Sequence, residues 1–235
     1  MLILMTMPKR KTYTKKTDID KPWYKKKGRS RYKNETVTMR KTFLIVCEGQ
    51  TEECYFKAFP IRTAVVRAVN LGGQSKMKLV ECAKELARQE ESDEVWCVFD
   101  MDVNRGEIEF RDFDNAIESA RSLNFHVAYS NDAFELWFYL HYQYTDVAQL
   151  RSFYYEQLGS LWGINYEKFG KEYRFSSGIF NKLQNDERAS MEKAISCAKR
   201  LFEMQKDRTY HEQNPLTMVY QLVRSLQKEC KEKSF

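Results

Sequence analysis

The chain has 235 residues, of which 43% are hydrophobic and 14% aromatic, so it is long and apolar enough to bury a core. Its longest apolar runs, FLIVC and VWCVF, are too short to cross a bilayer, and the apolar start MLILM precedes a basic stretch, the reverse of a secretory signal. The cysteines show no CxxC and no zinc spacing. We therefore expect a cytoplasmic protein with reduced cysteines and no membrane partner.

The positive charge is concentrated at the start of the chain. The formal net charge is +6, but residues 1–42 carry fourteen Lys and Arg against three Asp and Glu, a local net of +11, which leaves −5 for the rest. Residues 1–41 lack helical or strand periodicity and predict a basic, disordered arm. Such an arm either solubilises the protein or attracts nucleic acid, and aromatic residues for base stacking are present at Tyr13, Trp23, Tyr24 and Tyr32.

From residue 42 onward, apolar runs of strand type alternate with helical periodicity. We predict strands at 42–48, 63–70, 93–100 and 125–130, and helices at 51–59, 75–91 and 112–124. Continuous apolar strands separated by helices favour a mostly parallel sheet covered on both faces, which is an α/β fold. Asp112 and Asp114 are candidate N-caps of the third helix.

After residue 130 the strand signals end and helical stretches follow. They occupy 133–142, 146–158, 186–205 and 215–233. Pro215 fits the first turn of the last helix, with Asn214 as its cap. We therefore predict an α/β core at 42–145 and a helical C-terminal part at 146–235 packed on that core.

Acidic residues stand at the ends of two predicted strands. The first strand ends at Glu48, and the third ends at Asp100, followed two positions later by Asp102. Ligands of parallel sheets bind beyond the carboxyl ends of the strands, so these carboxylates can converge on one site. Their mutual repulsion would be relieved by a divalent cation, and all-oxygen ligands suit Mg²⁺ or Mn²⁺.

Each acidic signal has an ordinary structural explanation. Glu48 on its own is consistent with an exposed loop acid before a helix, whose first turn favours acidic residues through the helix dipole. A lone DxD is common in surface turns. A strand–Glu–Gly–helix segment followed about fifty residues later by a strand–Asp–x–Asp segment is much more specific.

Further candidates lie outside these strand ends. Glu135 interrupts an aromatic helical segment and is either an added carboxylate of the metal site or a partly exposed acid on an amphipathic helix. Lys76 and Lys78 are candidate ligands of substrate phosphates, together with the basic arm. His141 either makes a structural hydrogen bond or assists acid–base chemistry.

Four motifs in order carry a family resemblance. The segments CEGQTEECYF, VFDMDVN, SNDAFELWFYLHY and NPLTMVYQLV resemble the RloB family of bacterial anti-phage proteins, which is also found in abortive-infection systems, over about residues 42–225. The first two resemble a TOPRIM-type domain, which implies a TOPRIM-like α/β fold with a mostly parallel sheet flanked by helices. The resemblance implies that Glu48 is a metal ligand or general base and that Asp100 and Asp102 bind metal. It also implies that Gly49 permits a sharp turn and that Glu52 helps to hold a second metal, as in OLD-type nucleases.

The resemblance implies a Mg²⁺- or Mn²⁺-dependent nuclease in anti-phage defence, acting on RNA, with tRNA a candidate, or on DNA. A second hypothesis is a nucleic-acid-binding partner module that works only with an AAA/ABC-type ATPase. The resemblance supports it, because such ATPase genes commonly accompany this family. The chain itself contains no GxxxxGK[ST] motif, which is consistent with ATP control by a partner. A third is a binding protein whose acids are structural. The GxSxG and HExxH motifs of other hydrolases are absent.

Overall fold

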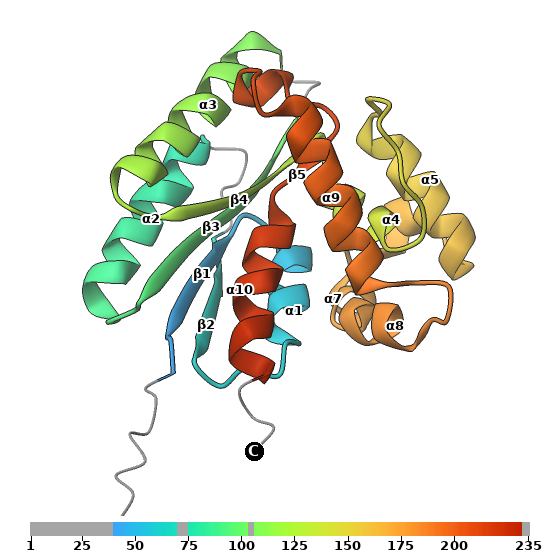
Figure 1. Ribbon diagram of the computed structural model, residues 1–235, viewed down its shortest axis with the longest axis horizontal. Coiled ribbons are helices and arrows are strands. Elements are labelled where there is room, and N and C mark those ends of the chain that lie inside the picture. The colour runs from blue at the N-terminus through green and yellow to red at the C-terminus, as the bar shows by residue number, and fades with distance from the viewer. Residues whose placement is uncertain (1–39, 70–74, 103–105, 232–235) are drawn as a thin grey trace, which may run out of the picture. The chain divides into compact units, whose positions relative to one another are not determined.

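The fold is built on a sheet to which both halves of the chain contribute (Figure 1). Its strands are β1 (Phe43–Cys47), β2 (Ala64–Ala68), β3 (Glu94–Met101), β4 (His126–Asn131) and β5 (Leu216–Thr217). Their order is β2-β1-β3-β4-β5, in which β1 to β4 are parallel and β5 is antiparallel to β4. The predicted fold class, a mostly parallel α/β sheet flanked by helices, is confirmed.

The structure is a computed structural model that describes residues 40–69, 75–102 and 106–231. Residues from Arg40 onward form one compact unit. The predicted basic arm and its aromatic residues lie outside the described part, apart from the last two residues of the arm. Within the described part, none of the helices combines the length and the apolar character that a bilayer-spanning segment requires.

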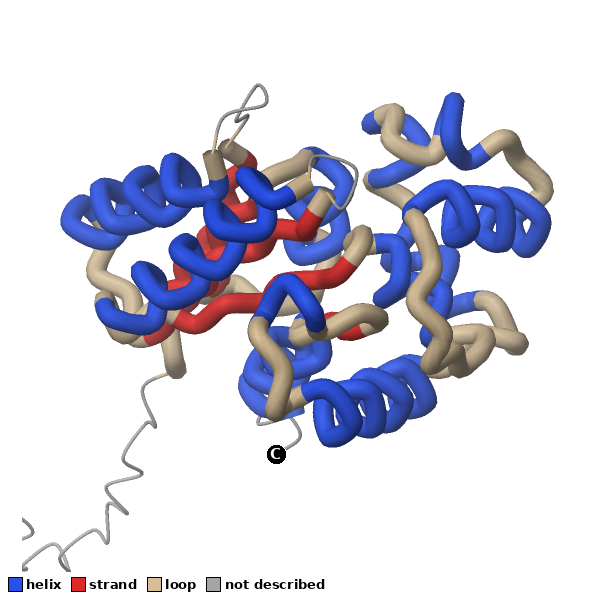
Figure 2. Tube along the Cα trace, turned by 90° about the horizontal axis from the view of Figure 1, so that it is seen from above, coloured by secondary structure: helices blue, strands red, loops and turns tan. Residues whose placement is uncertain are grey.

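Strands β1, β3 and β4 are largely buried because helices cover both faces of the sheet, whereas the edge strand β2 is partly exposed. All five residues of β1 are fully buried, as expected for a continuous apolar strand in the middle of a parallel sheet. Helices α2 (Lys76–Gln89) and α3 (Glu107–Ser122) lie side by side on one face, and α1 (Gln50–Lys57) and α10 (Val219–Lys231) cover the other (Figures 1 and 2).

The remaining helices lie beside the sheet, and all of them except the first belong to the C-terminal part at 146–235. They are α4 (Glu135–Leu140), α5 (Arg151–Trp162), α6 (Tyr166–Phe169), α7 (Tyr173–Ser176), α8 (Ile179–Asn185) and α9 (Met191–Gln205), followed by a short 3₁₀ helix at Tyr210–Glu212. Helix α4 is buried along its whole length and packs against α5 and α9, so it joins this part to the core. The predicted boundary at residue 145 stays a prediction.

The register of the strands brings two predicted site residues to the same edge of the sheet. Cys47, the last residue of β1, is level with Val98 of β3, and the backbone N–H of Glu48 donates to the carbonyl of Val98 over 2.9 Å. Asp100 lies two residues further along β3. The carboxyl ends of β1 and β3 therefore present their acids together.

Three predicted helix starts in the C-terminal part are wrong by four or five residues. Helix α10 begins at Val219 instead of Pro215, because Leu216 and Thr217 pair with the end of β4 as strand β5. Helix α5 begins at Arg151 and helix α9 at Met191, each five residues later than predicted.

The predicted N-caps of the third helix are also wrong. Helix α3 begins at Glu107 after Gly106, so Asp112 and Asp114 lie inside it. Their side chains accept hydrogen bonds from other elements instead: Asp112 from the backbone N–H of Lys76, and Asp114 from that of His211.

Candidate functional site

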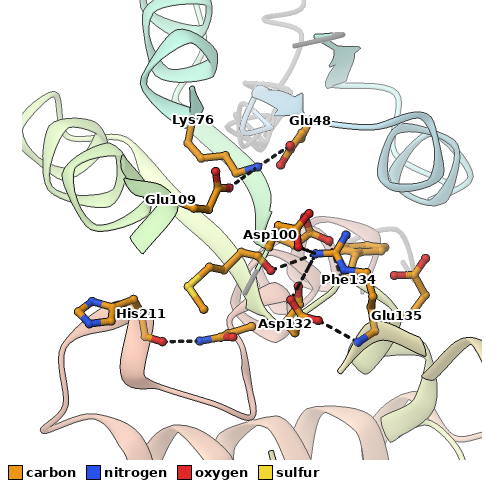
Figure 3. Close-up of polar contacts among 12 residues, drawn as sticks. Glu48, Lys76, Asp100, Glu109, Asp132, Phe134, Glu135 and His211 are labelled. Carbon is orange, nitrogen blue, oxygen red and sulfur yellow. Dashed lines mark hydrogen bonds and ion pairs between the residues drawn. The ribbon is translucent and has the colours of Figure 1, made fainter. Parts of the chain in front are cut away.

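A cavity of about 230 Å³ lies at the carboxyl ends of β1 and β3. It is lined by Glu48, Gly49, Gln50, Thr51, Glu52, Asp100, Glu135, Arg151 and Lys171, and is called the acidic cavity below. Its four carboxylates come from four places in the fold: the end of β1, the first turn of α1, β3 and the start of α4. Figure 3 shows how three of them, Glu48, Asp100 and Glu135, approach from separate elements.

Glu48 is held by a buried lysine. The Nζ atom of Lys76, at the start of α2, lies 2.5 Å from Oε1 of Glu48 and 3.3 Å from Oε1 of Glu109 on α3 (Figure 3). The other oxygen of Glu48, Oε2, is buried and has no hydrogen-bond partner in the described part of the chain. Burial raises the pKa of Glu48, Asp100 raises it further, and the Lys76 ammonium opposes both effects.

Glu52 is the most strongly perturbed carboxylate of the cavity. Its side chain is 9% exposed, and its pKa is raised to about 8 by burial first and then by the nearby carboxylates of Asp100, Glu135 and Glu48. A Cβ atom added at Gly49 would lie only 2.6 Å from Oε2 of Glu52, so a larger residue there would displace this carboxylate. The Glu–Gly pair thus leaves room for a second acid one turn into α1.

Asp100 and Asp102 have different surroundings. Asp100 lines the acidic cavity and accepts a hydrogen bond of 3.3 Å from the backbone N–H of Phe134. Asp102 does not line the cavity, and its Oδ1 lies 3.7 Å from the guanidinium of Arg151. The structure therefore brings Asp100 to Glu48 and Glu52 and holds Asp102 in an ion pair beside them.

Glu135 is a buried member of the cavity. It is 2% exposed, accepts a hydrogen bond of 3.2 Å from the hydroxyl of Tyr166, and lies 3.8 Å from Nζ of Lys171. Burial raises the pKa of Glu135, and although the Lys171 ammonium lowers it, Asp100 adds to the increase. Of the two interpretations of Glu135, the structure shows a buried acid facing polar groups, which differs from a partly exposed residue on an amphipathic helix.

The three candidates for substrate binding lie outside the acidic cavity. Lys76 is 2% exposed, and its ammonium forms ion pairs with Glu48 and Glu109. The side chain of Lys78 is 52% exposed, with Glu81 beside it, and borders a separate groove along α2. His141 is fully buried with Nδ1 2.9 Å from the carbonyl of Trp137, and burial lowers its pKa to about 4.

Sequence reasoning missed three residues around the cavity. Asp132 directly follows β4 and is fully buried, so the rule that applied to Glu48 and Asp100 would also have found it. Arg151 and Lys171 could not be found in this way, because helix packing brings them to the sheet from distant parts of the chain.

The cavity presents oxygen atoms of the kind that a hard divalent cation prefers as ligands. In the structure, however, these atoms are not arranged as a metal site. Clustered carboxylate oxygens and the unpartnered Oε2 of Glu48 are groups that Mg²⁺ or Mn²⁺ would satisfy. Among the described residues, however, no group of three or more His, Cys, Asp or Glu side chains is positioned to hold a metal ion. Glu48 and Asp102 face the cations Lys76 and Arg151 instead, so metal binding would require these side chains to reorient.

The fold and cavity define a class: an α/β protein with buried carboxylates at the carboxyl edge of a mostly parallel sheet. The family model described as RloB-like protein matches residues 43–226, which include every residue that lines the cavity. The chain belongs to the RloB-like family, as its motifs predicted. Neither the curated proteins nor the solved structures contain a match to this chain.

Proposed function

We propose that this protein is a metal-dependent nuclease that hydrolyses phosphodiester bonds of RNA or DNA in anti-phage defence. Membership of the RloB-like family is consistent with a defence-related role. The observation that carries the proposal is the acidic cavity, in which Glu48, Glu52, Asp100 and Glu135 share one small volume. Such concentrated buried charge is costly without a cation, and perturbed carboxylates in a cavity are typical of functional sites.

In this proposal Glu48 and Asp100 hold Mg²⁺ or Mn²⁺, with Asp102 beside them and Glu52 or Glu135 adding further oxygens. A bound metal would supply an activated water and stabilise charge on the phosphate. The protein positions the carboxylates at the rigid ends of β1 and β3, and Gly49 admits Glu52 to the same cavity. Glu52, which retains its proton at neutral pH in the metal-free protein, would release it when a cation is bound.

The reaction is hydrolysis. A water oxygen forms a new bond to phosphorus, the bond from phosphorus to the leaving sugar oxygen breaks, and the leaving oxygen takes a proton. The products are one strand end with a phosphate monoester and one with a hydroxyl. No oxidant, nucleotide or other co-substrate is needed.

Cleavage of a mixed RNA and DNA substrate with Mg²⁺ or Mn²⁺ tests the proposal. We expect Asp100→Asn and Glu48→Gln to lower the cleavage rate at least about 100-fold, because each removes a charged oxygen ligand. The matched controls Asp207→Asn and Glu203→Gln change exposed acids outside the cavity and should cleave at the wild-type rate. Cleavage that survives both cavity substitutions would exclude the proposed site.

The alternative, a module that works only with an ATPase partner, makes a different prediction for the same assay. The isolated protein would then be inactive with either metal and would cleave after addition of the ATPase and ATP. The chain itself contains no ATP-binding P-loop motif, which is consistent with ATP control supplied by such a partner. Activity of the isolated protein would argue against this alternative.

A further inference from the structure

The acidic cavity contains two cationic side chains as well as four carboxylates. Arg151 and Lys171 are the cations among its described lining residues. Both come from the C-terminal part of the chain, whereas three of the four carboxylates come from β1, α1 and β3. The cavity therefore combines carboxylates from the strand ends with cations that the C-terminal helices supply.

Arg151 is fixed to the ends of two strands. One of its nitrogens, Nη2, donates to the carbonyls of Met101 and Asp132, each over 3.1 Å, and to Oδ1 of Asp132 over 3.3 Å. Its backbone N–H donates to Oδ2 of the same aspartate over 2.8 Å. Because Asp132 is fully buried, the guanidinium is held in place before any ligand arrives.

The guanidinium of Arg151 retains unused hydrogen-bonding capacity. All its hydrogen bonds given above use Nη2, while Nε is buried and has no partner among the described residues. A buried N–H without an acceptor is unfavourable, and an arginine beside a cavity commonly binds phosphate or carboxylate oxygens.

Lys171 is held more loosely on the same side. Its Nζ atom lies 3.8 Å from Oε1 of Glu135 and 5.0 Å from the ring centroid of Tyr155. Glu135 is itself fixed by the hydroxyl of Tyr166. The side chain of Lys171 is 49% exposed, so its ammonium group remains accessible from solvent.

We infer that Arg151 and Lys171 bind the phosphate of the phosphodiester substrate, Arg151 as a preorganised anchor and Lys171 as a solvent-facing clamp. This inference rests on the proposed nuclease function and identifies the groups that contact the substrate at the same site. The assignment differs from the expectation for Lys76 and Lys78, neither of which lines the cavity.

The charge of the cavity supports this assignment. A phosphodiester carries one negative charge and would be repelled by the ionised carboxylates of the cavity. Metal held by the carboxylates would offset part of that repulsion, and the cations Arg151 and Lys171 would contact the non-bridging phosphate oxygens.

Binding without cleavage tests the inference. Wild-type protein and variants are titrated with a fluorescent single-stranded oligonucleotide, RNA and DNA in turn, over a series of salt concentrations, with Ca²⁺ in place of Mg²⁺ or Mn²⁺ to neutralise the carboxylates. Lys171→Gln should weaken binding by about threefold to tenfold and reduce the slope of log affinity against log salt by about 0.7, as expected for one lost phosphate contact. Lys171→Arg keeps the charge and should retain most of the affinity.

Lys168→Gln is the matched control, because Lys168 is an exposed lysine of α6 that carries the same charge but does not line the cavity. Equal weakening by Lys168→Gln and Lys171→Gln would overturn the inference, since it would show a general charge effect. Unchanged binding by Lys171→Gln would overturn it as well.

A second variant tests the anchor. Arg151→Lys preserves the charge but removes the planar guanidinium and its several N–H donors. We therefore expect weaker oligonucleotide binding and, if the protein cleaves, a lower kcat/KM. A circular dichroism melt checks that this variant is folded. If the Arg151 and Lys171 variants bind more weakly but the wild type does not cleave, the nuclease function is refuted and the inference is not. If the wild type cleaves with metal but these variants keep wild-type binding and kcat/KM, the inference is refuted and the nuclease function is not.

Discussion

The structure gives Lys76 a different role from the phosphate binding that the sequence predicted. Its ammonium is buried between the carboxylates of Glu48 and Glu109, so it serves as a fixed counter-ion in the metal-free protein. Although burial works against the charged form, these carboxylates and Asp100 raise the pKa of Lys76. It therefore stays charged at neutral pH.

Removing this counter-ion should destabilise the protein. Lys76→Met keeps most of the side-chain volume but leaves two carboxylates without their cation, so we expect a loss of about 3–5 kcal/mol in the free energy of unfolding. Urea denaturation followed by circular dichroism measures the change. Lys78→Met, two residues along the same helix and half exposed, is the control and should change stability by less than about 0.5 kcal/mol. Similar small changes in both variants would show that the buried ion pair is not important for stability.

Glu52 makes stability depend on pH. Its pKa rises from the ordinary 4.5 to about 8 on folding, mainly through burial, so between these values the folded state binds a proton that the unfolded state has lost. Stability should therefore fall as pH rises from about 4.5 to 8. With EDTA present, Glu52→Gln should reduce this fall, because the glutamine side chain does not titrate. At pH 8 the variant should exceed wild type in the free energy of unfolding by up to roughly 4 kcal/mol.

Thermal or urea denaturation of the two proteins from pH 5 to pH 9 checks this expectation. Glu203→Gln, an exposed acid of α9, should leave the pH dependence as in wild type. Parallel pH curves for wild type and Glu52→Gln would mean that Glu52 is ionised in the folded protein.

At the scale of elements, strand β5 joins the end of the chain to the sheet. It has only two residues, and the hydroxyl of Thr217 lies 2.8 Å from that of Ser130 on β4, with both side chains fully buried. This pair fixes the start of α10, which covers one face of the sheet.

The hydroxyl pair should behave as a coupled unit. Thr217→Val leaves the Ser130 hydroxyl without its partner and should cost about 1–3 kcal/mol in the free energy of unfolding, while Ser130→Ala/Thr217→Val should cost less than the sum of the two single changes. A double-mutant cycle by urea denaturation measures this. Strict additivity would show that the two hydroxyls do not interact.

The elements also show what local pattern can predict. Strands β1 to β4 and helices α1 to α3 followed from apolar runs and helical periodicity, because both signals are local. Strand β5 could not be predicted, since its two residues are extended only through pairing with β4. Helices α6 and α7, of four residues each, are too short for a periodic signal.

At the scale of the whole molecule, the candidate site contains residues that the sequence predicted and residues that it did not. The positions of Glu48 and Asp100 followed from the rule for the ends of parallel strands. Arg151 and Lys171 reach the same cavity only because helices of the C-terminal part pack beside the sheet. The carboxylates were thus predictable, and the cations facing them required the tertiary structure.

Titration calorimetry with Mn²⁺ most directly tests whether the acidic cavity binds a divalent cation. The wild-type protein should bind Mn²⁺, Asp100→Asn and Glu48→Gln should weaken binding at least about tenfold, and Asp207→Asn should bind as wild type does. Absence of Mn²⁺ binding by the wild type, or binding unchanged by both cavity substitutions, would contradict a metal site formed by these carboxylates.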